Sequence, residues 1–303
     1  MPSTHDSVIG PDVADPGASE RLDDELSGLD ALELAVGPTR NRWARTWSAT
    51  WPKLAAAALT IGVWQVVVWS GWRSEAILPG PGAVFTEFGH QLTGGKMLHG
   101  LSITMSRAAI GFGAALLVGG SVGLAVARVR FLRTAIGSMI TGLQTMPSIA
   151  WFPLAIVLFQ LSETAILFVV VFGAAPAIAN GIIAGVDTVP PLLDRVGTVL
   201  GATGLKRFRH VILPAAMPQL IAGMKQGWAF AWRSLMAGEL LVILGNRPSI
   251  GAQLQNARDL SDYPWMMSTM IMILIVGIAV DGLVFGTVER AVLRRRGLGS
   301  ARQ

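Results

Sequence analysis

The sequence predicts an all-α polytopic membrane protein with about six transmembrane helices, and three observations predict it. The chain of 303 residues is 52% hydrophobic but only 14% charged, with a mean hydropathy of +0.53. A soluble domain usually carries about 25% charged residues, so this chain lacks the polar surface of a soluble enzyme. Its uncharged residues form blocks long enough to cross a bilayer, which takes about 20 residues per helix. Its basic residues lie in short clusters between these blocks.

The N-terminal residues are expected to stay outside the membrane. Residues 1–50 are acidic and rich in Asp, Ser, Pro and Gly, and they lack the basic start and apolar core of a signal peptide. We interpret them as a mostly disordered cytoplasmic tail, with an amphipathic stretch at residues 22–34 that could form a short helix. The transmembrane domain is expected over residues 51–297, and residues 298–303 form a C-terminal tail.

The first two spans are expected at residues 54–72 and 108–127, neither of which contains a charged residue. The first has three tryptophans towards its far end, where interfacial aromatic anchors are found. In the second, Gly119 and Gly123 have the spacing that lets two helices approach closely. Glycine is common in membrane helices, so this pair alone is weak evidence for dimerisation.

The third uncharged block, residues 134–162, is 29 residues long and contains Pro147 and Pro153. It is too long for one straight span, which predicts either a kinked helix or a helix followed by a broken segment. The fourth span is expected at residues 164–186. It contains Pro176, which a membrane helix tolerates.

The last two spans follow the longest polar interval after the tail, residues 187–217. The fifth is expected from about residue 218 to 245 and is unusual because it contains Lys225, Arg233 and Glu239. The sixth is expected from about residue 264 to 288. It contains Asp281, which we place near its cytoplasmic end.

Six spans put both termini on one side of the membrane, and the basic residues indicate which side. Of the 24 Lys and Arg, 17 lie in the tail, the 128–133 loop, the 187–217 loop and the C-terminus, against four in the opposite loops. Because basic residues concentrate in cytoplasmic loops, both termini and the 187–217 loop are expected in the cytoplasm of a bacterial cell, with the chain in its plasma membrane. This topology also explains the net charge of +5 better than nucleic-acid binding does.

The sequence contains none of the common enzyme signatures. No cysteine is present, which excludes thiolate metal sites and a Cys nucleophile. No G-x-x-x-x-G-K-[ST] phosphate-binding loop and no H-E-x-x-H occur, and the four His lack metal-ligand spacing. We therefore expect no catalytic residue, no metal site and no cofactor in this chain. The sequence at this point is consistent with a role in transport, as a channel, in anchoring or in signalling.

The 187–217 loop predicts a pair of short helices. Gly201 or Gly204 would supply the sharp reversal between them, because glycine tolerates a positive φ. Pro214 and Pro218 would end the second helix and begin the next span. Such a hairpin is either a docking surface for another protein or a basic loop held at the lipid headgroups. Composition alone favours neither.

The same loop resembles the EAA loop of ABC-importer permease subunits. Gly201 matches the glycine of that pattern, and Ile212-Leu213-Pro214 matches its end, whereas the E-A-A positions fall on residues 195–197 and contain no Glu. Four further segments resemble the nitrate/sulfonate/taurine branch of these permeases, in order and at similar spacing. They are residues 78–81, 146–156, 176–181 and 231–240.

This resemblance implies a type I ABC-importer transmembrane domain, the MetI-like fold. It implies two permease subunits, in this branch usually identical, two ATPase subunits that carry ATP and Mg, and an extracytoplasmic solute-binding protein. The docking site for the ATPase would lie in the loop. Its expected residues are Arg195, Leu200, Gly201, Ala202, Gly204, Lys206, Arg207, Leu213 and Pro214.

The translocation pathway is harder to place from the sequence. Arg233 and Glu239 are candidates because ionisable residues inside a span are usually functional, and six residues apart they do not form a direct pair. Arg233 would suit an anion such as an aliphatic sulfonate, nitrate or a taurine-like solute, although a structural role explains both residues as well. The other pathway candidates, which core packing could also explain, are Met146, Trp151, Asn180 and Trp232.

Two alternatives to the permease remain at this point. A secondary transporter would need internal repeats and an ion site at the midplane, and no repeat between the two halves is visible. A membrane anchor or assembly protein would need no pathway of its own. Co-purification with an ATPase subunit would favour the permease alone.

Overall fold

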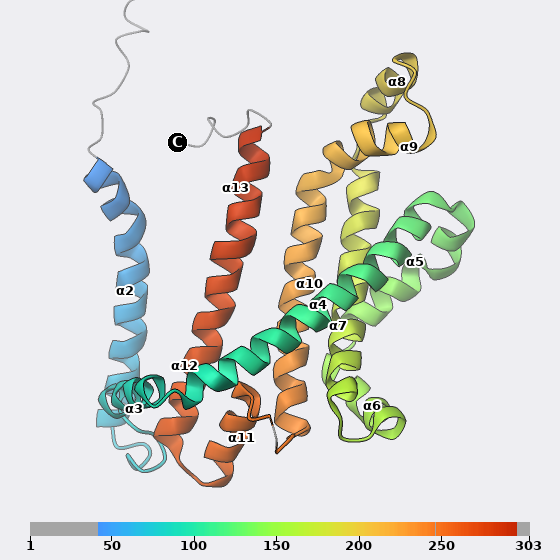
Figure 1. Cartoon of the computed structure of the whole chain (residues 1–303). Helices are drawn as coiled ribbons and strands as arrows, with labels where there is room; N and C mark the ends of the chain where they lie inside the picture. The colour runs from blue at the N-terminus through green and yellow to red at the C-terminus, as the bar shows by residue number, and fades with distance from the viewer. Residues whose placement is uncertain (1–41, 246, 296–303) are drawn as a thin grey trace, which may run out of the picture. The chain divides into compact units, whose positions relative to one another are not determined.

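The structure is a computed structural model that describes residues 42–245 and 247–295. Every regular element among these residues is a helix (Figure 1), as the hydropathy pattern predicts. The chain divides into two compact units, Met1–Val66 and Val67–Gln303. The amphipathic stretch at residues 22–34, most of the expected tail and the C-terminal tail lie outside the described residues.

The first described helix, α2, spans Arg42–Trp69 and contains Pro52. Its portion Thr50–Trp69 is long and apolar enough to cross a membrane. The helix begins well before residue 54, where the first span was expected. Hydropathy marks the part of a helix that lies in lipid, and the helix itself continues into the polar residues before it.

The second unit is a series of helices joined by short connections. The third uncharged block is divided as expected: α5 and the helical segment that follows it form a pair bent by 104° at Pro147. In chain order the α-helices are α3 (Pro81–Thr93), α4 (Lys96–Arg128), α5 (Arg130–Thr145), α6 (Phe152–Phe159), α7 (Glu163–Asp187), α8 (Pro191–Val199), α9 (Gly204–Arg207), α10 (Leu213–Leu241), α11 (Ile250–Asp259), α12 (Tyr263–Val280) and α13 (Gly286–Arg295).

Among the described residues, four helices are long and apolar enough to cross a membrane, and the bent pair makes a fifth candidate. The expected fifth span corresponds to α10, which has 29 residues but also carries Lys225, Arg233 and Glu239. The expected sixth span corresponds to α12, which continues through a π-helical segment, Asp281–Phe285, into α13. Asp281 lies inside a helical run that continues past the expected span, and its place near the cytoplasmic end of the span stays a prediction.

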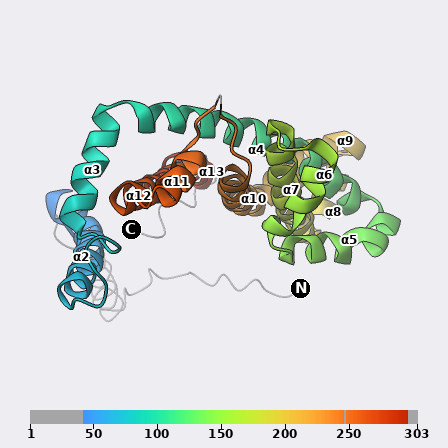
Figure 2. The same ribbon diagram turned by 90° about the horizontal axis from the view of Figure 1, so that it is seen from below.

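Helix α7 is the centre of the second unit and packs along both α4 and α10 (Figures 1 and 2). Small residues bring the backbones together. Gly119 and Gly123 of α4 meet Ala175 and Ala179 of α7, so the glycine pair joins two helices of the same chain. On the other side of α7, Gly181 lies directly against a glycine of α10. Close packing of this kind drives helix association where lipid removes the hydrophobic effect.

The substitution Gly123→Ala is expected to destabilise the packing of α4 on α7. An added Cβ would lie 2.8 Å from both the Cα and the carbonyl oxygen of Ala179, and backbone atoms cannot move aside as a side chain can. Overpacking of this kind costs about 1–3 kcal/mol of unfolding free energy. The loss of stability is measured as a lower thermal unfolding midpoint of the detergent-solubilised protein.

Gly113→Ala is the matched control on the same helix, because an added Cβ there meets no atom within 4 Å. It is expected to leave the unfolding midpoint unchanged or slightly higher, since Ala favours a helix over Gly. Equal midpoints for the two variants would contradict the assigned packing.

Candidate functional site

The 187–217 loop forms the helical hairpin that its glycines predict. Helix α8 ends at Val199, and Gly201 follows in the left-handed region with φ +77°. The N–H of Ala202 donates to the carbonyl of Gly197 (2.9 Å), and the N–H of Gly201 donates to the carbonyl of Thr198 (3.0 Å). These two bonds are the Schellman motif, which ends a helix with a glycine and satisfies its last carbonyls. These hydrogen bonds therefore fix the shape of the turn.

The second arm of the hairpin is continuous with a long helix. Gly204, also with positive φ, begins α9, which passes through the π-helical segment Phe208–Ile212 directly into α10. The break expected at Pro214 and Pro218 is absent: Pro214 lies in the first turn of α10, and Pro218 lies inside it. Pro214 lies two residues after the end of the π-helical segment, and local π adjustments let a helix accommodate a proline without ending.

The two arms touch at Gly197. A Cβ added there would lie 2.9 Å from a methyl group of Val211, so a glycine allows α8 to lie close against the π-helical segment. Val211 lies two residues before α10, so α8 contacts the helical run at the base of α10.

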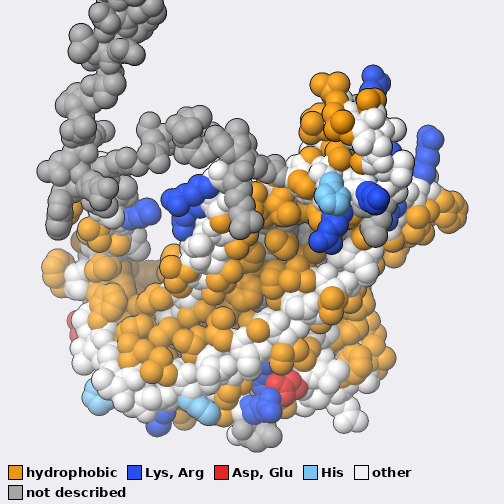
Figure 3. Space-filling model, turned by 45° about the horizontal axis from the view of Figure 1, so that its top comes forward, with side chains coloured by type: hydrophobic (Ala, Val, Ile, Leu, Met, Phe, Trp, Pro, Cys, Tyr) orange, Lys and Arg blue, Asp and Glu red, His pale blue; other side chains and the backbone are white. Residues whose placement is uncertain are grey.

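Apolar side chains are exposed at the tip of this hairpin (Figure 3). Val199 is 87% exposed and Leu200 is 80% exposed, and further apolar side chains of α8 (Leu192, Leu193 and Val196) are also exposed. A protein rarely leaves contiguous apolar residues in water unless they meet a partner.

The expected docking residues lie in this hairpin, with different exposure. Ala202, Arg207 and Leu213 are half-buried. The others, Arg195, Leu200, Gly201, Gly204, Lys206 and Pro214, are exposed. The hairpin thus exposes basic side chains (Arg195 and Lys206) as well as its apolar tip, a combination suited to a protein partner. The docking role of these residues stays a prediction.

The six pathway candidates are not gathered at one place. Met146 and Trp151 belong to the bent α5–α6 connection, where the Trp151 ring lies 5.2 Å from that of Phe172. Asn180 of α7 donates to the side-chain oxygen of Gln144 of α5, and both residues are half-buried. The remaining three, Trp232, Arg233 and Glu239, are all on α10.

The three α10 candidates have separate surroundings. Trp232 is buried, stacks on Trp228 and borders a hollow of about 680 Å³ between α10, α11 and α12. Arg233 is exposed, donates from Nε to the carbonyl of Ala229 (3.1 Å) and lies 4.9 Å from the ring centre of Phe230. Arg233 and Glu239 make no contact with each other, as their spacing predicts. The pathway roles stay predictions.

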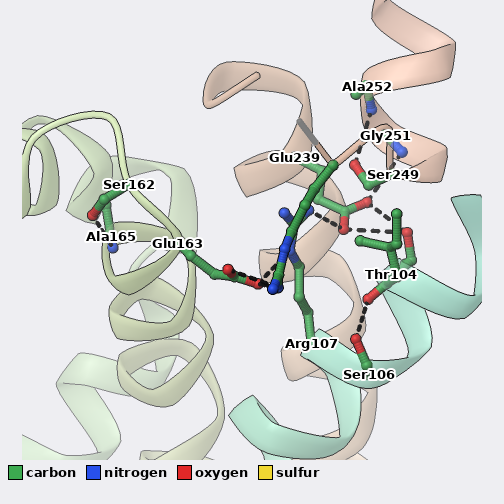
Figure 4. A network of polar contacts seen from close by, with 12 residues as sticks. Thr104, Ser106, Arg107, Ser162, Glu163, Ala165, Glu239, Ser249, Gly251 and Ala252 are labelled. Carbon is green, nitrogen blue, oxygen red and sulfur yellow. Dashed lines mark hydrogen bonds and ion pairs between the residues drawn. The ribbon is translucent and has the colours of Figure 1, made fainter. Parts of the chain in front are cut away.

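Glu239 belongs to a buried polar network that the sequence did not indicate (Figure 4). Its side chain is 0% exposed and pairs with Nη1 of Arg107 (3.0 Å), itself 2% exposed. Nε of Arg107 also binds Glu163 at the start of α7 (3.2 Å), and Arg247 binds Glu163 from the other side (3.0 Å). Arg107 lies at the edge of an expected span, and that position was the only signal available.

A second intramembrane ion pair joins Lys225 of α10 to Asp281 (3.0 Å), and both side chains are half exposed. This pair explains why two opposite charges are tolerated within apolar helices. Within residues 42–245 and 247–295, no group of three or more His, Cys, Asp or Glu could hold a metal ion.

Long apolar helices joined to an exposed helical hairpin are the architecture of a polytopic membrane protein. The chain belongs to the family described as the binding-protein-dependent transport system inner membrane component, which matches residues 98–296. It is therefore a membrane permease component of an ABC importer, a class of transporter that works with an ATPase subunit and a solute-binding protein.

Individual relatives place the chain in the branch that its motifs resemble. It is 28% identical to the "Putative aliphatic sulfonates transport permease protein SsuC" of Bacillus subtilis (strain 168), covering 89% of this chain and 95% of the relative. It is also 28% identical to the nitrate import permease protein NrtB of Synechocystis sp., covering 77% of this chain and 86% of the relative.

A solved structure shows the same fold. The inward-facing MetNI methionine ABC transporter matches with a TM-score of 0.56 at 18% identity, covering 65% of this chain and 95% of the matched chain. The MetI-like fold expected from the sequence is thus confirmed.

Proposed function

We propose that this chain forms the translocation pathway for a small anionic solute (an aliphatic sulfonate, nitrate or taurine-like compound) and is driven by ATP hydrolysis on a separate subunit. It acts as a transporter subunit and not as an enzyme, since its sequence has no phosphate-binding loop. ATP and Mg are bound by the partner ATPase. Relatives named for sulfonate, nitrate and bicarbonate transport, all anions, support the charge of the solute.

The observation that carries this proposal is the apolar tip of the hairpin. Val199 and Leu200 are the most exposed apolar side chains of the hairpin, at a turn held by two backbone hydrogen bonds. A rigid tip of this kind, continuous with a membrane helix, suits a partner that pushes on it. A secondary transporter needs no such surface, and an anchor protein needs no rigid connection from it to the helix core.

The orientation follows from the basic residues. The hairpin and both termini face the cytoplasm, where the ATPase binds. The side of the molecule that carries α11 faces the solute-binding protein. We further propose that two copies of this chain pair as a homodimer around the pathway.

Arg233 is the residue we assign to the solute. It is exposed on a face of α10 that also carries the exposed Gln226. An arginine inside a membrane faces a water-filled cavity or another protein surface, because contact with lipid tails is costly. A cation on the pathway attracts an anionic solute.

Leu200→Asp, alone or with Gly201→Asp, is expected to abolish ATPase binding and uptake while the protein still inserts in the membrane. A charge at the tip would have to be desolvated on docking, and a non-glycine residue at 201 strains the turn. Co-purification of the ATPase subunit with the tagged permease measures docking directly. ATP-dependent solute uptake in cells measures function.

Leu260→Asp is the matched control, because Leu260 is 72% exposed and directly follows α11. Helix α11 lies at the opposite end of α10 from the hairpin (Figure 1). This variant is expected to retain the ATPase subunit. If Leu200→Asp retained the ATPase and normal uptake, the docking assignment and the ATP-driven mechanism would both be wrong.

Arg233→Gln is expected to raise the KM for uptake of the anionic solute by about tenfold, the effect of losing about 1.4 kcal/mol of attraction. Arg233→Lys keeps the charge and should remain close to the parent protein. Uptake of taurine, an alkanesulfonate and nitrate is measured separately for each variant. An unchanged KM in Arg233→Gln for the transported solute would remove Arg233 from the pathway.

A further inference from the structure

The network around Glu239 attaches α11 to the end of α10. The Glu239 carboxylate accepts hydrogen bonds from Thr104 (2.9 Å), from Arg107 (3.0 Å) and from the backbone N–H of Gly251 (3.1 Å). Thr104 in turn accepts a bond from the N–H of Ile250 (3.0 Å). Side chains of α10 and α4 therefore satisfy the first backbone N–H groups of α11, which would otherwise lack partners (Figure 4).

Two glycines show how closely α11 lies against these helices. A Cβ on Gly251 would overlap the Glu239 side chain, and a Cβ on Gly100 of α4 would overlap Gln253 of α11. Gln253 also donates to the carbonyl of Lys96 at the start of α4 (2.9 Å). The first turn of α11 is thus held to α4 and α10 by hydrogen bonds.

One turn beyond these contacts, α11 borders open space. Leu254 borders the hollow of about 680 Å³ that also contains Trp232, and it borders a second hollow of about 450 Å³ together with Gln255 and Arg258. A movement of α11 would therefore change the shape of both hollows. α11 packs against α12, α10 and α4 at the end of α10 remote from the hairpin (Figures 1 and 2).

One continuous helical run joins the hairpin to Glu239. Residues 204–241 are helical throughout, through α9, the π-helical segment and α10. At 1.5 Å per residue this run is about 57 Å long, enough to cross the hydrocarbon core of a bilayer. A displacement of the hairpin therefore reaches Glu239 through helix backbone alone.

We infer that Glu239 is a positioning residue that makes α11 move with α10, so that ATP-driven displacement of the hairpin reshapes the hollows at the opposite end of the pathway. Its bonds to Arg107, Thr104 and the first turn of α11 join the parts that must move together. This inference rests on the proposed function, because it requires that an ATPase displaces the hairpin.

The test uses the purified complex of this chain with its ATPase subunit in lipid nanodiscs, and it needs no knowledge of the solute. The chain has no cysteine, so Gln255→Cys introduces a single thiol on the face of α11 that borders the hollow. Its reaction rate with a water-soluble maleimide is measured without nucleotide and after trapping with ATP, Mg²⁺ and orthovanadate. We expect the two rates to differ by about tenfold, within the usual range of coupling between two sites.

Glu239→Gln in the same background is expected to abolish this nucleotide dependence while ATP hydrolysis continues. The amide keeps the shape of the side chain but loses the charge that pairs with Arg107. A purely stabilising role for Glu239 would lower the unfolding midpoint and leave the nucleotide dependence intact. A nucleotide-dependent rate in Glu239→Gln would overturn the inference.

Thr104 supplies a second, independent pair of variants in case Glu239→Gln fails to assemble. Thr104→Val removes the bonds to Glu239 and Ile250 at constant shape, and it should lose the nucleotide dependence. Thr104→Ser keeps the hydroxyl and should retain it. If the maleimide reaction rate depended on nucleotide to the same extent in both Thr104 variants, the inference would also be overturned. Loss of the ATPase subunit from the parent complex would instead count against the proposed function.

Discussion

The ion pair between Arg107 and Glu239 is the interaction on which the arrangement of the second unit depends most. A charge that leaves water is tolerated in a membrane helix only when it is paired and hydrogen-bonded. Both residues are almost completely buried, and each has further partners: Glu163 for Arg107, and Thr104 and Gly251 for Glu239. The requirement to satisfy these two charges therefore sets how α4, α7, α10 and α11 meet.

The rest of the packing is consistent with that constraint. Helix α7 lies between α4 and α10 through contacts of glycine and alanine, so the three backbones are close enough for Arg107 to reach both acidic residues. Larger residues at Gly123 or Gly181 would separate the helices. The same small residues that bring the helices together thus also make the buried ion pair possible.

The hairpin and the network lie at opposite ends of α10, and this arrangement relates the structure to transport. Alternating access in such a protein requires that a force applied at one end moves the other, and packed helices transmit displacements as units. The Schellman turn at Gly201 and the contact of Gly197 with Val211 fix the hairpin to the base of α10. The polar contacts of Glu239 fix α11 to its far end.

The all-helical membrane fold, the broken third span, the turn glycines Gly201 and Gly204 and the permease family were determined by the sequence alone, because hydropathy, proline and glycine act locally along the chain. The continuous helix through Pro218, the use of Gly119 and Gly123 against α7, and the partners of Glu239 were decided only by the tertiary structure. Arg107 and Glu239 are 132 residues apart in the chain. No local pattern indicates which distant charge will neutralise another, because that depends on which helices pack side by side.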